Sequence, residues 1–112
     1  MKGTYLGEFE ELVLLITGIL HEDAYAVSVA KEIEDQTGRS VSLSAVHTAM
    51  YRLEEKGFVS SNLGGATKAR GGRRKRIYII TSAGKAALNE VRLMRNRLWE
   101  QIPGTSLNLG EI

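Results

Sequence analysis

No cysteine occurs anywhere in the chain, and proline occurs only once. Without thiols the protein has no disulfides, no thiolate metal ligands and no cysteine nucleophile, and such a composition suits a reducing compartment. The two histidines, His21 and His47, stand too far apart in the sequence for the ligand spacing of a metal site. We therefore expect no metal and no cofactor.

Long apolar runs are missing as well. The apolar run Leu12–Leu20 is nine residues long and follows the acidic residues Glu8, Glu10 and Glu11. A membrane span needs about twice that length, and a signal peptide carries basic residues ahead of its apolar part. We expect a cytoplasmic protein with no membrane partner.

Signatures of catalysis are also absent. The sequence contains no serine elbow, no phosphate-binding loop with its lysine, and no histidine–carboxylate pair at helical ligand spacing. The adjacent acidic pairs Glu10-Glu11 and Glu54-Glu55 would diverge on their helices instead of sharing a site. The sequence therefore predicts no catalytic residue and a protein that is not an enzyme.

What the chain does carry is an uneven distribution of charge. Its 112 residues, 43% hydrophobic and 25% charged, suffice for one globular domain with a modest core. The formal net charge is +2, but residues 1–38 sum to −6 and residues 39–85 sum to +8. A basic middle beside an acidic first third favours a surface for a polyanion, although a charged run is also typical of an ordinary solvated face.

The first expected helix, from about Gly7 to Leu20, is apolar on more than one side. One face at helical spacing is formed by Phe9, Leu12, Val13, Ile16, Ile19 and Leu20. Leu14 and Leu15 lie outside that face, so the second half of this helix is apolar almost all round. Such a helix is buried on two sides, and either a partner subunit or a later helix of the same chain would supply the second cover.

Two further helices joined by a short turn match the dimensions of a helix-turn-helix. The second helix is expected at about Ala24–Thr37, with Asp23 as its N-cap and Gly38 just after its C-terminus. Ser42 can then cap a third helix, which ends at Gly57. The turn of about four residues between the two helices has the length found in this motif.

The third helix has one apolar stripe and one polar face. The stripe is formed by Leu43, Val46, Met50 and Leu53. The opposite face carries Ser44, Thr48, Arg52 and Glu55, with His47 and Tyr51 towards its edges. Small polar groups near the start of a helix, followed by an arginine, suit contacts with base edges and phosphates in a DNA major groove. Taken alone, the pattern is also typical of an ordinary surface helix.

Two segments rich in branched and aromatic residues, Phe58–Leu63 and Arg76–Thr81, are expected to pair as a hairpin. A helix-turn-helix followed by a hairpin is the winged-helix arrangement. The loop between the strands contains no large apolar side chain, and residues 68–76 hold no acidic one. Its positive charges are Lys68, Arg70, Arg73, Arg74, Lys75 and Arg76. This wing suits contact with phosphates, and the alternative is a flexible hairpin kept soluble by its charge.

The last helix is expected to run from a cap at Thr81 or Ser82 to about Ile102, just before Pro103. One of its faces has coiled-coil-like spacing at Ala87, Val91, Met94 and Leu98, and Leu88 and Trp99 lie on a neighbouring stripe. About 30 Å long, this helix would overhang so small a domain, so we expect it to pack on a second copy of the chain.

The predicted fold class is α+β, mainly helical with a small β-hairpin. Residues 1–81 are expected to form the winged helix-turn-helix DNA-binding domain. Residues 82–102 would form a C-terminal dimerisation helix, and residues 103–112 a flexible tail.

The chain resembles the PadR family of bacterial winged-helix transcriptional regulators. The matching stretches are LGEFEELVLLITGIL, AYAVSVAKEIEDQTGRSVSLSAVHTAMYRLEEKGFVSS and GGRRKRIYIITSAG, which cover nearly everything from Leu6 to Leu88. Within them the most specific combination is the run Arg52–Glu54 near the end of the third helix, Gly57, and the basic wing that leads into the second strand. The short C-terminal part is similar to the small branch of the family, which has a single terminal helix.

The resemblance implies a homodimer joined through the first and last helices, bound to an inverted-repeat operator in double-stranded DNA. We expect a repressor, because a dimer seated over a promoter blocks polymerase without further parts. The expected DNA contacts are Ser42, Ser44, His47, Thr48, Tyr51, Arg52, Lys68, Arg70, Arg73, Arg74, Lys75 and Arg76. The expected dimer interface consists of Phe9, Leu12, Leu15, Val91, Met94, Leu98 and Trp99.

Alternatives remain for several of these residues. His47, where the family commonly has a tyrosine, could instead pack half-buried at the edge of the apolar stripe, and Tyr51 could pack against the wing. Trp99 could anchor the dimer. It could also bind a small hydrophobic effector, since some small members of the family hold flat aromatic drugs between paired tryptophans of the last helix.

A different hypothesis is a winged-helix interaction module that recognises no operator. Such a module would bind a protein partner or RNA through the acidic first two helices or through the apolar faces.

Overall fold

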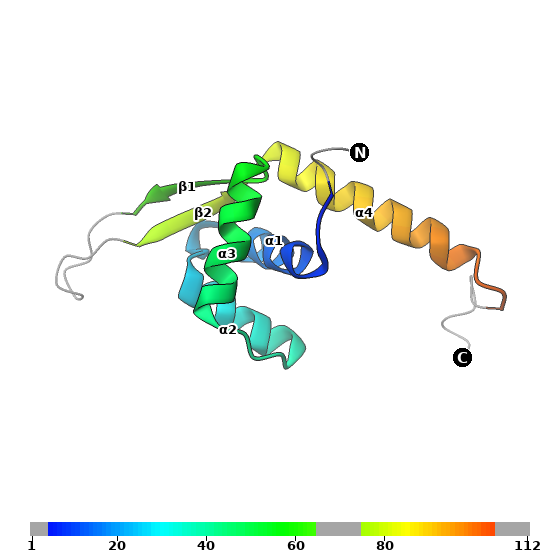
Figure 1. The fold of residues 1–112 in the computed structure, drawn as a ribbon, viewed down its shortest axis with the longest axis horizontal. Coiled ribbons are helices and arrows are strands. Elements are labelled where there is room, and N and C mark those ends of the chain that lie inside the picture. Colours follow the sequence, from blue (N-terminus) through cyan, green and yellow to red (C-terminus); the bar gives the residue numbers. More distant parts are fainter. Residues whose placement is uncertain (1–4, 65–74, 105–112) are drawn as a thin grey trace.

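The computed structural model describes residues 5–64 and 75–104. The elements in chain order are α1 (Glu8–Leu20), the short 3₁₀ helix η1 (His21–Asp23), α2 (Ala26–Thr37), α3 (Leu43–Glu55), β1 (Val59–Leu63), β2 (Arg76–Ile80) and α4 (Ser82–Glu100). The two strands pair antiparallel, with Val59 opposite Ile80 and Leu63 opposite Arg76. The predicted α+β winged-helix fold is confirmed (Figure 1).

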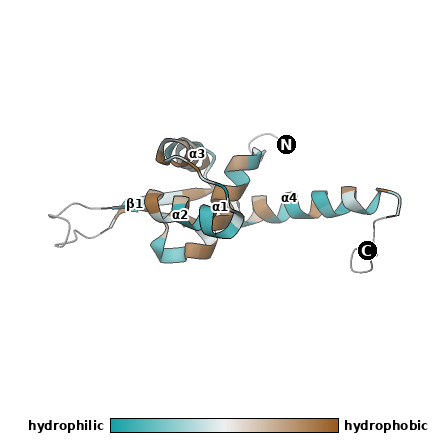
Figure 2. Cartoon of the chain, turned by 90° about the horizontal axis from the view of Figure 1, so that it is seen from below, coloured by the Kyte–Doolittle hydropathy of each residue, from teal (hydrophilic) through white to brown (hydrophobic). Residues whose placement is uncertain are grey.

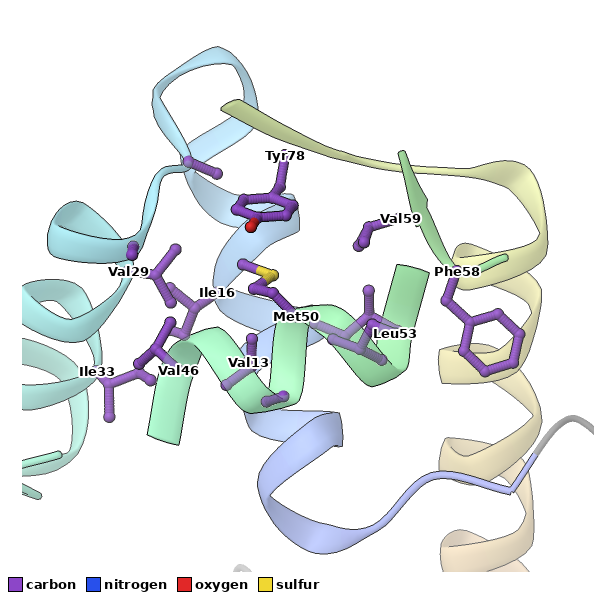
Figure 3. Close-up of a cluster of buried hydrophobic side chains, with 14 of the residues drawn as sticks. Val13, Ile16, Val29, Ile33, Val46, Met50, Leu53, Phe58, Val59 and Tyr78 are labelled. Atoms are coloured by element: carbon purple, nitrogen blue, oxygen red, sulfur yellow. The ribbon is translucent and has the colours of Figure 1, made fainter. Parts of the chain in front are cut away.

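Helices α1, α2 and α3 enclose one hydrophobic core, and the base of the hairpin covers it. The labelled side chains of Figure 3 belong to this core: Val13, Ile16, Val29, Ile33, Val46, Met50, Leu53, Phe58, Val59 and Tyr78. Burying a side chain of this size completely stabilises the fold by about 1.5–3 kcal/mol before entropy is subtracted. The inward stripe of α3 is therefore held firmly, and the orientation of its outward face follows from it.

The predicted helix ends are largely confirmed. Gly38 and Gly57 adopt positive φ angles of 77° and 82°, the left-handed conformation that glycine tolerates best. Ser42 caps α3, because its side-chain oxygen accepts a hydrogen bond from the backbone N–H of Ala45 at 3.0 Å. Thr81, one of the two caps considered for the last helix, caps α4 by the same geometry.

The start of α2 differs from the prediction. The helix begins at Ala26 instead of Ala24, and Asp23 is part of η1 and not the N-cap. The reason is tertiary: the carbonyl of Ala24 accepts a hydrogen bond from the backbone N–H of Tyr78 in β2 at 2.8 Å, which holds Ala24 in an extended conformation. The backbone N–H of Tyr25 then donates to the Ser28 hydroxyl at 3.0 Å.

Burial on α1 and α3 also departs from the simple stripes. Leu14, placed outside the predicted apolar face, is fully buried, whereas Ile19 is 58% exposed. Strand β2 covers this second side of α1, since the side chain of Ile80 lies next to Gly18. Leu43, the first residue of α3, is 45% exposed, so the buried stripe of α3 begins one turn later.

Only the first part of α4 contacts the core. Gly84 and Ala87 are buried, Leu88 and Val91 are half-buried, and every residue of α4 from Arg92 onward is exposed. Figure 1 shows the helix projecting away from the rest of the domain, as the prediction of an overhanging helix requires. Figure 2 shows hydrophobic and hydrophilic bands along this projecting part too, so apolar side chains remain on it.

Within residues 5–64 and 75–104, no helix combines the length and apolarity needed to cross a membrane. The same residues include no cluster of three or more histidine or acidic side chains that could hold a metal ion. They also include no buried side-chain nitrogen or oxygen without a hydrogen-bond partner.

Gly84 provides a test of this packing. A Cβ at this position would collide with the carbonyl oxygen of Phe58 and would lie 2.9 Å from Cγ1 of Ile80. We expect Gly84→Ala to lower the free energy of unfolding by about 1–3 kcal/mol through overpacking, measured by urea denaturation. Ala86→Ser, an exposed change on the same helix, should stay within about 0.5 kcal/mol of the parent. Equal stability of the Gly84→Ala protein and its parent would contradict the close approach of α4 to Phe58.

Candidate nucleic-acid interface

The outward side of α3 carries the polar residues that the sequence places there. Four residues of α3 anchor its inner side in the core: Val46, Ala49, Met50 and Leu53. On the opposite side Ser44, Thr48 and Arg52 are exposed, together with the cap residue Ser42. This surface is polar and lies along one side of a single helix, and an α-helix is an element that fits into a DNA major groove.

His47 and Tyr51 are both exposed on α3. His47 is exposed and not half-buried at the edge of the stripe, and Tyr51 is 63% exposed. The Tyr51 hydroxyl bonds to the carboxylate of Glu55, one turn further along the helix, and this bond raises the pKa of Tyr51. A negative charge thus lies on the outward face of α3, one turn or less from the positive charge of Arg52.

A shallow groove separates this face from the first turn of α1. Its lining includes Ser44, Thr48 and Arg52 from α3 and Glu8 and Glu10 from α1. Both carboxylates would repel phosphate if they stood alone. Their pairing with cations from neighbouring elements is therefore relevant to the interface.

Each of the two α1 carboxylates has a cationic partner. Arg39, in the turn between α2 and α3, donates to Glu8 at 2.8 Å, and this hydrogen bond lowers the pKa of Glu8 and raises that of Arg39. Lys56, just after α3, donates to Glu10 at 2.6 Å and to the backbone carbonyl of Tyr5 at 2.8 Å. The first turn of α1 is thereby tied to the turn between α2 and α3 and to the end of α3, and the charges of Glu8 and Glu10 are each paired with a cation.

The base of the wing is fixed to both helices of the helix-turn-helix. Lys75 places its ammonium group over the ring of Tyr25 at the start of α2, 4.1 Å from the ring centroid. Arg76 donates from Nη1 to the hydroxyl of Ser61 at 2.9 Å, and this hydroxyl donates to the carboxylate of Glu54 in α3 at 2.8 Å. The predicted wing residues Lys68, Arg70, Arg73 and Arg74 lie outside the described residues.

The sequence analysis did not predict a role for Tyr25 or Ser61. It named Glu54 only as part of the run Arg52–Glu54 that carries the family resemblance. Their roles depend on which residues of the hairpin face each other and on where β2 meets the start of α2. The alternation of strand residues could have placed Ser61 and Arg76 on one face, but only with the register known. Ser61 lies between Arg76 and Glu54 in the fold, but the three residues are apart in the sequence, so no sequence pattern indicates their contact.

The predicted dimer-interface residues fall into two groups. Phe9, Leu12 and Val91 are partly buried against the core of their own chain. The others are largely exposed: Leu15, Met94, Leu98 and Trp99. On α1, on α4 and just after α4, the described residues include three further exposed apolar side chains that the prediction left out: Ile19, Leu93 and Ile102.

A second groove runs between α1 and the projecting part of α4. It has a volume of about 560 Å³, and Leu15, Leu88 and Trp99 are among its lining residues. Trp99 is 52% exposed there. Pockets that bind small molecules commonly have volumes of about 300–1,000 Å³, and this groove lies within that range.

Comparison with known proteins agrees with this geometry. Residues 15–90 match the model of the transcriptional regulator PadR-like family. An uncharacterized protein from Lysinibacillus sphaericus is 32% identical over 87 residues, which cover 76% of this chain and 75% of that one.

Solved structures show the same fold. The crystal structure of a PadR family transcriptional regulator from Eggerthella lenta is similar with a TM-score of 0.64 and 28% identity, over 78% of this chain and 73% of that one. The structure of Bacillus subtilis PadR in complex with operator DNA has a TM-score of 0.63 at 16% identity. The match covers 77% of this chain and 47% of the Bacillus chain, so it supports the shared fold alone.

Proposed function

Since the chain belongs to the PadR-like family of transcriptional regulators, we propose that it acts as a homodimer that recognises an inverted-repeat operator in double-stranded DNA. The observation that carries the proposal is the exposed polar face of α3 beside a wing base held on the same helices. Membership of a family of regulators also agrees with the prediction that the chain is not an enzyme.

In the proposed complex, residues 1–81 form the DNA-binding domain and α3 enters the major groove. Ser44 and Thr48 are small enough to let the helix approach base edges closely, and Arg52 reaches a phosphate or a guanine. The cations of the wing, Lys68, Arg70, Arg73 and Arg74, neutralise phosphates beside the groove. The two α3 helices of the dimer would lie about 34 Å apart, one turn of the duplex.

We further propose that residues 82–102 form the dimerisation helix. The projecting part of α4 exposes Met94 and Leu98, and the neighbouring surface of α1 exposes Leu15. Burial of apolar area contributes about 25 cal/mol for each Å², so covering these side chains with the same elements of a second copy favours association. A dimer bound over a promoter would block polymerase and so act as a repressor. Because its operator would lie in chromosomal DNA, we propose that the protein works in the cytoplasm.

The groove between α1 and α4 supports a role for a small effector. A flat aromatic or hydrophobic molecule could stack on Trp99 against Leu15 and Leu88. Because the groove borders the proposed dimerisation helix, a bound molecule would favour one arrangement of the two subunits over another.

Selection from a random DNA pool tests the central proposal. We expect the protein to enrich an inverted repeat, and its affinity to fall steeply between about 50 mM and 200 mM salt as phosphate contacts release counterions. Salt-dependent binding without an enriched motif would indicate a non-specific architectural role. No binding even at low salt would refute the DNA-binding proposal and leave the module that binds a protein partner or RNA.

Dimerisation is tested by placing charge on the exposed apolar face of α4 at Met94 and Leu98, which we call the seam. The double variant Met94→Asp/Leu98→Asp should sediment as a monomer and bind the operator at least about tenfold more weakly, because the second half-site is lost. Leu93→Asp, an equally exposed leucine on the other side of α4, is the matched control and should remain dimeric. A dimeric double variant would rule out this seam as the interface.

The effector proposal is tested by the fluorescence of Trp99, the only tryptophan in the chain. Titration with a planar aromatic dye should quench this fluorescence, and Leu15→Asp should weaken binding of the dye by about tenfold or more, since it places a charge in the apolar lining. Quenching that is the same in the Leu15→Asp protein would place the dye elsewhere.

A further inference from the structure

The wing and α3 are joined by a chain of two hydrogen bonds that ends in opposite charges. The guanidinium of Arg76, the first residue of β2, donates to the hydroxyl of Ser61 in β1 at 2.9 Å. The same hydroxyl donates to the carboxylate of Glu54, in the last turn of α3, at 2.8 Å. We call the three residues the wing–helix relay.

The direction of the relay is fixed by the chemistry of its members. A guanidinium only donates, a carboxylate only accepts, and a hydroxyl has one proton to give and lone pairs to accept with. Ser61 therefore uses its proton on Glu54 and its lone pair on Arg76. Both bonds involve a charged partner, which makes each stronger than a neutral one, although their exposure to solvent reduces the gain.

The relay adds a polar restraint on this side, where Val59 of β1 is already buried in the same core as Leu53 of α3 and the backbone N–H of Phe58 donates to the carbonyl of Leu53. A two-stranded hairpin is marginally stable by itself, so its angle to the rest of the domain depends on contacts at its base. On the α2 side those contacts are the stack of Lys75 on Tyr25 and the backbone hydrogen bond from Tyr78 to Ala24. On the α3 side the relay joins the hairpin to the helix.

We propose that Glu54 and Ser61 are positioning residues for DNA binding: through Arg76 they hold the wing at the angle to α3 that lets the wing and α3 contact one duplex. In this role Arg76 is a member of the relay and not a ligand of phosphate. The inference rests on the proposed DNA-binding function, and it reassigns Arg76 from the predicted set of DNA contacts.

Simple electrostatics predicts the opposite outcome for Glu54, which makes the proposal testable. Removal of a carboxylate near a polyanion should strengthen binding if charge alone matters. If Glu54 positions the wing, Glu54→Ala should instead weaken binding to the operator by roughly three- to tenfold. Ser61→Ala should have a similar effect, although it changes no charge.

The adjacent residue Glu55 provides a matched control. Its carboxylate bonds to Tyr51 on the outward face of α3 and takes no part in the relay. Glu55→Ala should therefore leave affinity unchanged or raise it. Two neighbouring carboxylates would then respond differently to the same substitution, with weaker binding only for Glu54→Ala, which general repulsion of phosphate cannot produce.

The salt dependence of binding distinguishes positioning from phosphate contact at Arg76. Loss of one phosphate contact lowers the slope of log affinity against log salt by about 0.9, or about twice that for both subunits of a dimer. We expect Arg76→Gln to weaken binding with the slope unchanged. The double variant Glu54→Ala/Arg76→Gln should bind the operator as tightly as the single variant with the lower affinity, because both changes break the same relay.

These measurements use the full chain and its selected operator, with thermal unfolding to confirm that every variant is folded. Binding of the Glu54→Ala protein equal to or tighter than that of the parent would overturn the inference, and so would a lower salt slope for Arg76→Gln. Either result leaves operator binding by the parent protein intact. Failure of the parent to bind any DNA would refute the proposed function as well.

Discussion

The burial of the inner stripe of α3 is the constraint on which the rest of the structure depends. Val46, Met50 and Leu53 are completely inaccessible to solvent, and Met50 lies at the centre of the core in Figure 3. A helix held this firmly on one side has its other side fixed in direction. The packed stripe therefore fixes the direction of the polar face of α3. It also fixes the positions of the groove beside α1 and of the hairpin base, since both adjoin this helix.

Elements specified by local chemistry could be predicted from the sequence. The limits of α3 follow from a serine cap and a glycine with positive φ, both of which act within a few residues. The exposed face of α3 follows from helical spacing alone, so Ser44, Thr48 and Arg52 lie where expected. The fold class followed from these elements in their order, together with the hairpin. The family followed from the resemblance of long sequence stretches between Leu6 and Leu88.

Features that depend on contacts between distant segments could not be predicted in this way. Ala24 is kept out of α2 by a hydrogen bond to Tyr78, more than fifty residues later. The helical pattern of α1 predicted a second buried side, but it could not indicate that the hairpin, and not a later helix or a partner subunit, covers Leu14 there. The partners of Arg76 depend on the register of the hairpin, and that register is a property of the whole fold.

The close contact of Gly84 with Phe58 makes α4 a lever whose pivot lies at the entrance to the wing. Phe58 follows the end of α3 and precedes β1, and its carbonyl oxygen also accepts a hydrogen bond from the backbone N–H of Thr81. From Gly84 to Glu100 the helix extends about 24 Å, so a tilt of about 5° at the pivot displaces its far end by about 2 Å. In the proposed dimer, small rearrangements between the two copies would thus reach the base of the wing at Phe58 and Thr81 as changes of angle.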